Sequence, residues 1–157
     1  MNEPSSGYSL LHPESPAAWV RFDQPAEWIL VVRVLGELDG VTVPPLRRAL
    51  DAQRRRTRPC RLVLDLAGVS LLSSAALTLL LELHHDTRDK DQHLILAGTG
   101  HRAVHRPLRV TGLLALFDTC PAVENALRGA TVSRRPPRSR GTALAGTSAP
   151  GKGDHHR

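Results

Sequence analysis

The stretch RLVLDLAGVSLLSSAALTLLLEL, residues 61–83, joins an apolar run to a leucine-rich run through two adjacent serines. Residues 62–66 are apolar except for Asp65, as is typical of a buried parallel strand, and the leucines of residues 77–83 predict a helix. Ser73 and Ser74 therefore lie where a strand passes into a helix N-terminus. A hydroxyl there sits beside free backbone N–H groups and the positive end of a helix dipole, which tolerate added negative charge. The alternative is that one serine only caps the helix.

The rest of the chain alternates between patterns typical of strands and patterns typical of helices. Residues 101–110 are interpreted as a helix or an irregular turn, because Pro107 interrupts them. The expected strands are residues 18–22, 28–35, 60–66, 92–97 and 113–117, and the other expected helices are residues 43–56, 74–84 and 121–127.

The resulting order, ββαβαβαβα, predicts the α/β class, with one domain built on a mixed, mostly parallel β-sheet packed with helices. The first two strands are expected to form a hairpin around a turn at residues 23–25, and residues 36–40 to end the second strand. Residues 1–17 are rich in Pro, Ser and Gly and predict a flexible leader. The folded domain is expected over residues 18–130, followed by a disordered basic tail over residues 131–157.

The formal charge of +6 is concentrated in that tail. Residues 131–157 hold six basic residues and one acidic residue, whereas residues 1–130 hold 15 basic and 14 acidic residues. Tails of this kind more often make weak electrostatic contacts than specific contacts with nucleic acid. Only 3% of the residues are aromatic, so platforms for stacking bases are also scarce. Specific binding of nucleic acid is therefore not expected.

The two cysteines, Cys60 and Cys120, lie far apart and form no CxxC pair. Neither a zinc site nor a disulfide framework is expected, and the cytoplasm is the simplest location. The first residues lack a signal-peptide pattern, and no stretch is long enough to span a membrane. We therefore expect a soluble protein without a membrane partner.

The sequence contains none of the motifs GxGxxG, GxxxxGK[ST], GxSxG or HExxH. His101 and His105 have a spacing that suits a metal on a helix, but no acidic or thiol ligand accompanies them, and Arg102 and Arg106 would repel a cation. We therefore expect no metal, no cofactor and no catalytic residues. A hydrolase that uses one of the serines is disfavoured, because the sequence shows no partner base.

Three segments together resemble the STAS-domain anti-sigma factor antagonists of bacteria. They are VLGELDG at residues 34–40, LVLDLAGVSLLSSAALTLL at residues 62–80 and AVHRPLRVTGLLALF at residues 103–117. The resemblance covers about residues 19–127. It implies a non-enzymatic protein that binds an anti-sigma factor with a histidine-kinase-like ATPase fold and frees a sigma factor for transcription. It also implies a switch, in which that same partner phosphorylates the protein as a serine kinase, and a serine phosphatase as a further partner.

The family segment Asp, Ser, Ser or Thr, Gly, Leu falls on residues 73–77, so the resemblance makes Ser74 the phosphoacceptor, with Ser73 as the alternative. Ser73 replaces the family's Asp and Ala76 replaces its Gly. These departures keep open a constitutive binding module without a phosphoswitch, and nucleic-acid binding through the tail is a weaker alternative. The helix of residues 74–84 and the turn of residues 36–43 should form the contact face at one end of the sheet. The residues expected to bind the partner are Glu37, Asp39, Gly40, Ser73, Ser74, Ala75 and Ala76.

Overall fold

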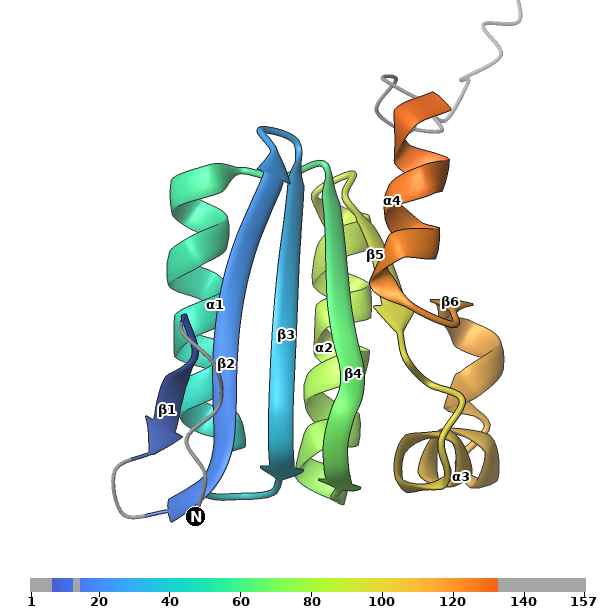
Figure 1. Cartoon of the computed structure of the whole chain (residues 1–157). Helices are drawn as coiled ribbons and strands as arrows, with labels where there is room; N and C mark the ends of the chain where they lie inside the picture. The colour runs from blue at the N-terminus through green and yellow to red at the C-terminus, as the bar shows by residue number, and fades with distance from the viewer. Residues whose placement is uncertain (1–6, 13–14, 133–157) are drawn as a thin grey trace, which may run out of the picture.

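The computed structural model describes residues 7–12 and 15–132 of the chain. Four helices, one short 3-10 helix and six strands follow one another in this part (Figure 1). In chain order they are β1 (Ser9–His12), β2 (Ser15–Ala26), β3 (Ile29–Leu38), α1 (Val43–Thr57), β4 (Arg61–Leu72), α2 (Ser74–Asp89), β5 (His93–Ala97), α3 (Arg102–Val110), η1 (Leu113–Leu116), β6 (Asp118–Cys120) and α4 (Val123–Val132).

The six strands form one sheet in the order β1-β2-β3-β4-β5-β6. β1, β2 and β3 are antiparallel neighbours, whereas β3, β4, β5 and β6 run parallel. Each parallel step is made through a helix, as crossover connections require. The predicted α/β fold with a mixed, mostly parallel sheet is confirmed. The carboxyl ends of β3 and β4 lie at the same end of the sheet, and α3 lies at that end too (Figure 1).

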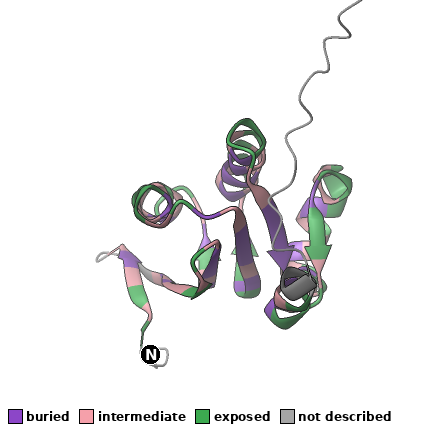
Figure 2. Ribbon diagram, turned by 90° about the horizontal axis from the view of Figure 1, so that it is seen from above, coloured by how far each residue is buried: buried purple, intermediate pink, exposed green. Residues whose placement is uncertain are grey.

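Side chains alternate between two apolar layers along the central strands. In β3, Leu30 and Val32 belong to the larger layer, which also takes buried residues from α1, α2 and α3. Ile29 and Val31 belong to the smaller layer, together with residues of α4. Helices therefore cover both faces of the sheet, as the view from above shows (Figure 2). A strand covered on both faces has to be apolar throughout, which is why these strands read as continuous apolar runs.

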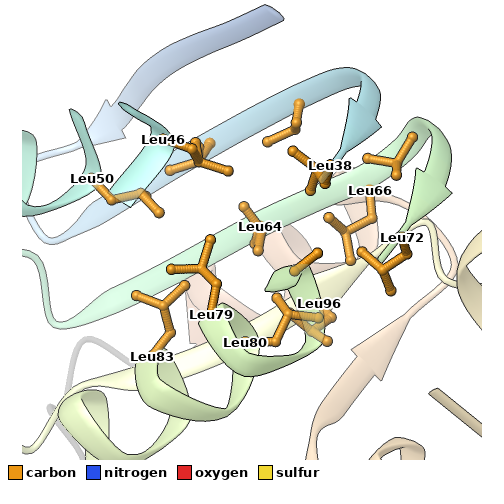
Figure 3. Packing of buried hydrophobic residues seen from close by; sticks show 14 of the residues in the cluster. Leu38, Leu46, Leu50, Leu64, Leu66, Leu72, Leu79, Leu80, Leu83 and Leu96 are labelled. Atoms are coloured by element: carbon orange, nitrogen blue, oxygen red, sulfur yellow. The ribbon is translucent and has the colours of Figure 1, made fainter. Parts of the chain in front are cut away.

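Leucine fills most of the larger layer, because the chain has few aromatic residues. Leucine side chains of β4, β5 and α2 point toward one another across the space between the sheet and the helix (Figure 3). The labelled leucines of these three elements are Leu64, Leu66, Leu72, Leu79, Leu80, Leu83 and Leu96.

The face of the sheet beyond the α4 layer carries ion pairs. Arg33 lies two positions after Val31, so its side chain points to the same face. Its guanidinium contacts Asp65 at 3.0 Å and Asp23 at 3.3 Å. Asp65 also accepts a hydrogen bond from the backbone amide of Ala67 at 3.0 Å. The one acidic residue inside the apolar run of β4 therefore has a structural role.

The expectation of a flexible leader over residues 1–17 is wrong for residues 9–12 and 15–17, which form β1 and the start of β2. Residues 1–6 and 13–14 lie outside the described part of the chain. β2 also continues through the expected turn at residues 23–25, and the chain reverses at residues 27–28 instead. The pairing register shifts between Asp23 and Ala26, and a shift of this kind accommodates Pro25, which cannot donate to a ladder. Strand pairing therefore overrides these local turn signals.

The segment of residues 36–40 was expected to end the second strand, yet β3 continues through Gly36 to Leu38. Gly36 has a φ of +93°, and a Cβ at this position would lie 1.8 Å from the carbonyl oxygen of Ala17. The glycine therefore lets two backbones approach closely inside the sheet. β4 lengthens in parallel, and its end pairs with the extension of β3, with Leu38 opposite Leu72.

The expected strand of residues 113–117 is also wrong. Leu113–Leu116 is a 3-10 helix that begins after Gly112 at a φ of +75°, and the last strand is Asp118–Cys120. A short apolar run does not distinguish a strand from a helical turn, so only pairing with β5 decides where β6 lies.

Two further segments differ in detail from the expected boundaries. Residues 101–110, expected to form a helix or an irregular turn, contain the helix α3, Arg102–Val110, despite Pro107. α4 extends to Val132, past the start of the expected tail, and residues 133–157 lie outside the described part.

Candidate functional site

The two segments expected to form the contact face lie side by side. The backbone amide of Ser73, just before α2, donates a hydrogen bond to the carbonyl oxygen of Leu38, the last residue of β3, at 3.0 Å. The side chains of Leu38 and Leu72 are buried directly behind this junction. The prediction that both segments lie at one end of the sheet is confirmed, whereas partner binding there stays a prediction.

Ser73 is the N-cap of α2. Its backbone is extended, with φ −79° and ψ 173°, and its side-chain oxygen accepts a hydrogen bond from the backbone amide of Ala76 at 3.4 Å. Its carbonyl oxygen accepts the first helical hydrogen bond, from Leu77, at 3.0 Å. Ser73 is half-buried. The sequence predicted that one of the two serines could cap the helix, and the structure shows that it is Ser73.

Ser74 is the first residue of α2, and it is exposed. Its carbonyl oxygen accepts a hydrogen bond from the hydroxyl of Thr78 at 3.0 Å. Its own hydroxyl has no hydrogen-bond partner among residues 7–12 and 15–132. The first turn of α2 carries no acidic residue, so no side chain of that turn compensates the positive end of the helix dipole. A phosphoryl group on this oxygen would be reachable from solvent and electrostatically tolerated by the helix.

Asp39 organises the loop between β3 and α1. Its carboxylate accepts hydrogen bonds from the backbone amides of Val41 at 2.9 Å and Thr42 at 3.0 Å. These bonds, with a further one from the Thr42 hydroxyl, hold the pKa of Asp39 below its usual value. Thr42 is fully buried, and its hydroxyl donates to the carbonyl oxygen of Glu37 at 2.8 Å. Asp39 therefore holds the loop in shape, whatever else it contacts.

Besides Ser74, the residues exposed to solvent near this junction include Glu37, Gly40 and Val41, and Leu71 near the end of β4. Val41 is 50% exposed and Leu71 is 46% exposed, so two large apolar side chains reach solvent in this region. Glu37 and Leu71 are paired across the β3–β4 ladder, so charged and apolar groups are neighbours here. The sequence reasoning missed Val41 and Leu71. The available signals were an apolar residue directly after a glycine in a turn, and a leucine pair that breaks strand alternation.

The two alanines expected to bind the partner lie differently. Ala75 is half-buried, whereas Ala76 is 1% exposed and packs in the core. Ala76 therefore leaves almost no side chain for a partner to contact. A partner at this place would meet Ser74 and the exposed end of the helix instead.

A third segment is tied to this edge of the sheet through His101, which immediately precedes α3. Its Nδ1 lies 3.0 Å from the carbonyl oxygen of Gly98, and its Nε2 lies 2.8 Å from the carbonyl oxygen of Val69 in β4. The ring thus holds the loop after β5 against the end of β4. This explains the conformation of His101 better than the metal-binding spacing with His105.

In the described part of the chain, no group of three or more His, Cys, Asp or Glu side chains is placed to hold a metal ion. Cys60 and Cys120 are both free thiols, and burial raises the pKa of Cys120. A membrane-spanning helix is likewise not found in these residues, since none of their helices is both long and apolar enough.

A family model described as the STAS domain matches residues 23–126 of this chain. An anti-sigma factor antagonist from Mycobacterium paratuberculosis has a similar structure, with a TM-score of 0.64, 29% sequence identity and coverage of 76% of this chain and 97% of that one. The unphosphorylated form of the anti-sigma factor antagonist SpoIIAA has a TM-score of 0.62 at 17% identity, covering 73% and 98%. The phosphorylated form of SpoIIAA, from Bacillus, has a TM-score of 0.56 at 16% identity, covering 70% and 98%. The last two similarities concern the fold.

Proposed function

This chain belongs to the STAS domain family, and from that premise we propose that it is an anti-sigma factor antagonist switched by phosphorylation of Ser74. It binds an anti-sigma factor that is also a serine kinase with a histidine-kinase-like ATPase fold. Binding frees a sigma factor for transcription, and a serine phosphatase restores the unmodified form. The chain is the substrate of the kinase and catalyses no step itself. The observation that carries the proposal is the exposed, unpartnered hydroxyl of Ser74 at the start of α2.

The different hydrogen bonding and exposure of the two serines support Ser74 as the phosphoacceptor. The side-chain oxygen of Ser73 is engaged as the helix cap, and Ser73 is half-buried. Modifying it would disrupt the cap. Ser74 is exposed and its hydroxyl caps nothing. A kinase can therefore reach it without unfolding the start of α2.

Phosphorylation at this place acts on the docking face and spares the fold. It adds about −1.5 to −2 charges beside the positive end of α2, where the helix dipole stabilises them. The same edge already carries the exposed carboxylate of Glu37 and the apolar side chains of Val41 and Leu71. Added negative charge and bulk next to these side chains weaken a partner that docks on them. A loss of about 3 kcal/mol lowers affinity more than a hundredfold.

Two structurally similar proteins are anti-sigma factor antagonists, which supports this proposal. The antagonist from Mycobacterium paratuberculosis shares 29% identity over almost its whole length. SpoIIAA has been solved both unphosphorylated and phosphorylated, so one protein with this fold exists in both states. The replacements at Ser73 and Ala76 fit the same local structure, because a serine side chain caps the helix and the alanine packs into the core.

The test is a reconstitution with the anti-sigma factor that co-purifies with the chain from its own cells. The complex is incubated with ATP, and the tryptic peptide of residues 62–88 is mapped by mass spectrometry. We expect phosphate on Ser74 and release of the partner. Ser74→Ala should keep partner binding and abolish both phosphorylation and release, while Ser73→Ala is the matched control that should retain both.

Other outcomes separate the parts of the proposal. A stable complex that gains no phosphate makes the chain a constitutive binding module. Phosphate on Ser73 moves the switch by one residue. If the chain captures no anti-sigma factor at all, the antagonist function itself is wrong.

A further inference from the structure

Helix α3 presents two different faces. Val104 and Leu108, one turn apart, are completely buried in the larger apolar layer. Arg102, Arg106 and Arg109 are exposed on another side of the helix. The buried face fixes the helix against the sheet, so the basic face is held in place without contributing to the core.

A cavity of about 660 Å³ lies along this basic face. Three arginines, His105, Gly100 and Val110 line it, and none of these side chains is acidic. The arginines occupy positions i, i+4 and i+7, so their attachment points extend over about 10 Å of the helix axis. The chain carries no Asp or Glu between Asp91 and Asp118, so α3 and its flanking loops supply no counter-charge.

The guanidinium groups of Arg102, Arg106 and Arg109 make no ion pair or hydrogen bond with any residue that the structure describes. Arginines elsewhere in the fold are used differently. Arg33 pairs with two carboxylates on the sheet, and Arg54 contacts Asp86 at 2.5 Å and Gln92 at 2.5 Å. The α3 guanidinium groups therefore have no polar contact with the described fold that a ligand would have to displace.

A second basic cavity, of about 610 Å³ between α1 and α2, provides a comparison. Its lining includes Arg54, Lys90 and three further arginines, but also the carboxylates of Asp51 and Asp86. Asp86 contacts both Arg54 and Lys90. That cavity neutralises part of its own charge, whereas the α3 cavity has only cationic and neutral lining.

The start of α3 adds to the positive potential. Its N-cap, His101, makes no capping hydrogen bond through its side chain, and its first turn has no acidic residue. The ring of His101 instead contacts the carbonyl oxygens of Gly98 and Val69, which anchors this end of the helix to the sheet. The N-terminal backbone amides next to Gly100 are thus positioned beside the arginines.

We propose that this cavity, the α3 pocket, binds a small polyanion that carries at least two phosphoryl groups. Guanidinium groups bind phosphoryl oxygens through two parallel hydrogen bonds, and the cationic lining repels the metal ions for which the His101 and His105 spacing was considered. The attachment points of the three arginines extend over about 10 Å of helix axis, so linked phosphoryl groups can engage all three along the helix. Helix α3 lies at the same end of the sheet as the start of α2, where Ser74 is located (Figure 1).

The test uses the full chain and sodium tripolyphosphate as the probe. Binding is followed by isothermal titration calorimetry at about 0.15 M salt, and by amide chemical shifts in NMR spectra. We expect saturable binding, with the largest shift changes between Gly100 and Val110. The variant Arg102→Gln/Arg106→Gln/Arg109→Gln should bind at least about tenfold more weakly.

The matched control removes the same charge from the C-terminal segment, as Arg134→Gln/Arg135→Gln/Arg138→Gln. It should bind tripolyphosphate as wild type does. Equal losses in both triple variants, or shift changes spread over the whole chain, would show charge attraction without a site and overturn the proposal. Inorganic phosphate that binds as tightly as tripolyphosphate would overturn the requirement for two phosphoryl groups. Duplex DNA that competes at equal phosphate concentration would assign the arginines to nucleic acid instead.

Discussion

The backbone amide of Ser73 donates to the carbonyl oxygen of Leu38 across 3.0 Å, and this bond joins the end of β3 to the cap of α2. Two segments separated by more than thirty positions in the sequence thereby become one surface. Ser74 begins the helix beside this bond, and the β3–α1 loop extends from its other side. The position of the candidate phosphoacceptor relative to Glu37 and Val41 is therefore set by the backbone of the sheet.

Replacing Ser73 by Ala should destabilise the protein by about 0.5–1 kcal/mol, because α2 loses its side-chain cap. The lower part of the known range is expected because the bond to the amide of Ala76 is long, at 3.4 Å. Urea unfolding followed by circular dichroism measures the change. Ser74→Ala is the control and should stay within about 0.5 kcal/mol of wild type, because the Ser74 hydroxyl is exposed and does not cap the helix. Equal effects of the two substitutions would contradict the assigned roles.

Gly36→Ala should destabilise the sheet by about 2 kcal/mol or more. The new methyl group would meet the carbonyl oxygen of Ala17, and the residue would keep a φ of +93°. Gly40→Ala offers a control, since a Cβ there has no neighbour within 4 Å. Thermal unfolding should show a clear drop for Gly36→Ala and little change for Gly40→Ala. A Gly36→Ala protein as stable as wild type would mean that β2 and β3 do not approach as described.

The free energy of unfolding should increase with pH up to about pH 6.5, the ordinary pKa of an imidazole, because of His84. Burial lowers the pKa of His84 below 6.5, and the positive charges of Arg88 and His85 act in the same direction. The His84 ring packs edge-on against Phe117, with 5.4 Å between ring centroids, and its Nε2 is buried without a hydrogen-bond partner in the described chain. The unfolded chain therefore binds a proton more readily than the folded one.

This contribution of His84 is complete above pH 6.5 and is lost as the pH falls through 6.5 toward the lower folded value. Melting temperatures measured from pH 5 to pH 8 in steps of about half a unit test the sign. His84→Gln should flatten the wild-type slope in this window. His85→Gln, at an exposed position, should leave most of the slope in place. A wild-type stability that falls with rising pH in this window would reverse the assignment.

The double variant Val41→Ser/Leu71→Ser should weaken binding of the anti-sigma factor by at least about tenfold, equivalent to about 1.4 kcal/mol. Both side chains are about half exposed, so the fold loses little by their replacement. The control is Val110→Ser/Leu116→Ser, which removes two other exposed apolar side chains, at 76% and 40%. Surface plasmon resonance with the unphosphorylated protein measures both. If the control variant loses as much affinity, the contact face extends over α3 and η1 or lies there.

Local patterns in the sequence were sufficient for most of the fold. Continuous apolar runs identified β3, β4 and β5, and helical spacing identified α1 and α2, because these strands and helices bury the faces that their patterns mark. The strand-to-helix junction at residues 73–74 was also visible, since serine is a strong N-cap residue. The order of strands and helices then implied parallel crossovers and a shared sheet edge.

Where the prediction from the sequence was wrong, the conformation depends on contacts with segments that are distant in the sequence. Residues 9–12 carry no strong strand pattern, yet they pair with β2, which in turn pairs with β3. Leu113–Leu116 forms a 3-10 turn without a fully buried residue, and of this apolar run Phe117, which follows the turn, is the residue buried in the core. In both cases the free energy comes from long-range pairing and packing, which a local pattern does not contain.

The sequence by itself determined the α/β class, the parallel centre of the sheet and the presence of serines at a helix start. Only the tertiary structure decided which serine caps the helix, which apolar side chains remain exposed beside it, and which arginines lack a counter-charge. The physical reason is that hydrogen-bond partners, exposure and ion pairing are relations between segments. The hydrogen-bond donor to Ser73, the exposure of Leu71 and the lack of an acidic side chain in the cavity that Arg106 lines are all set by the three-dimensional arrangement.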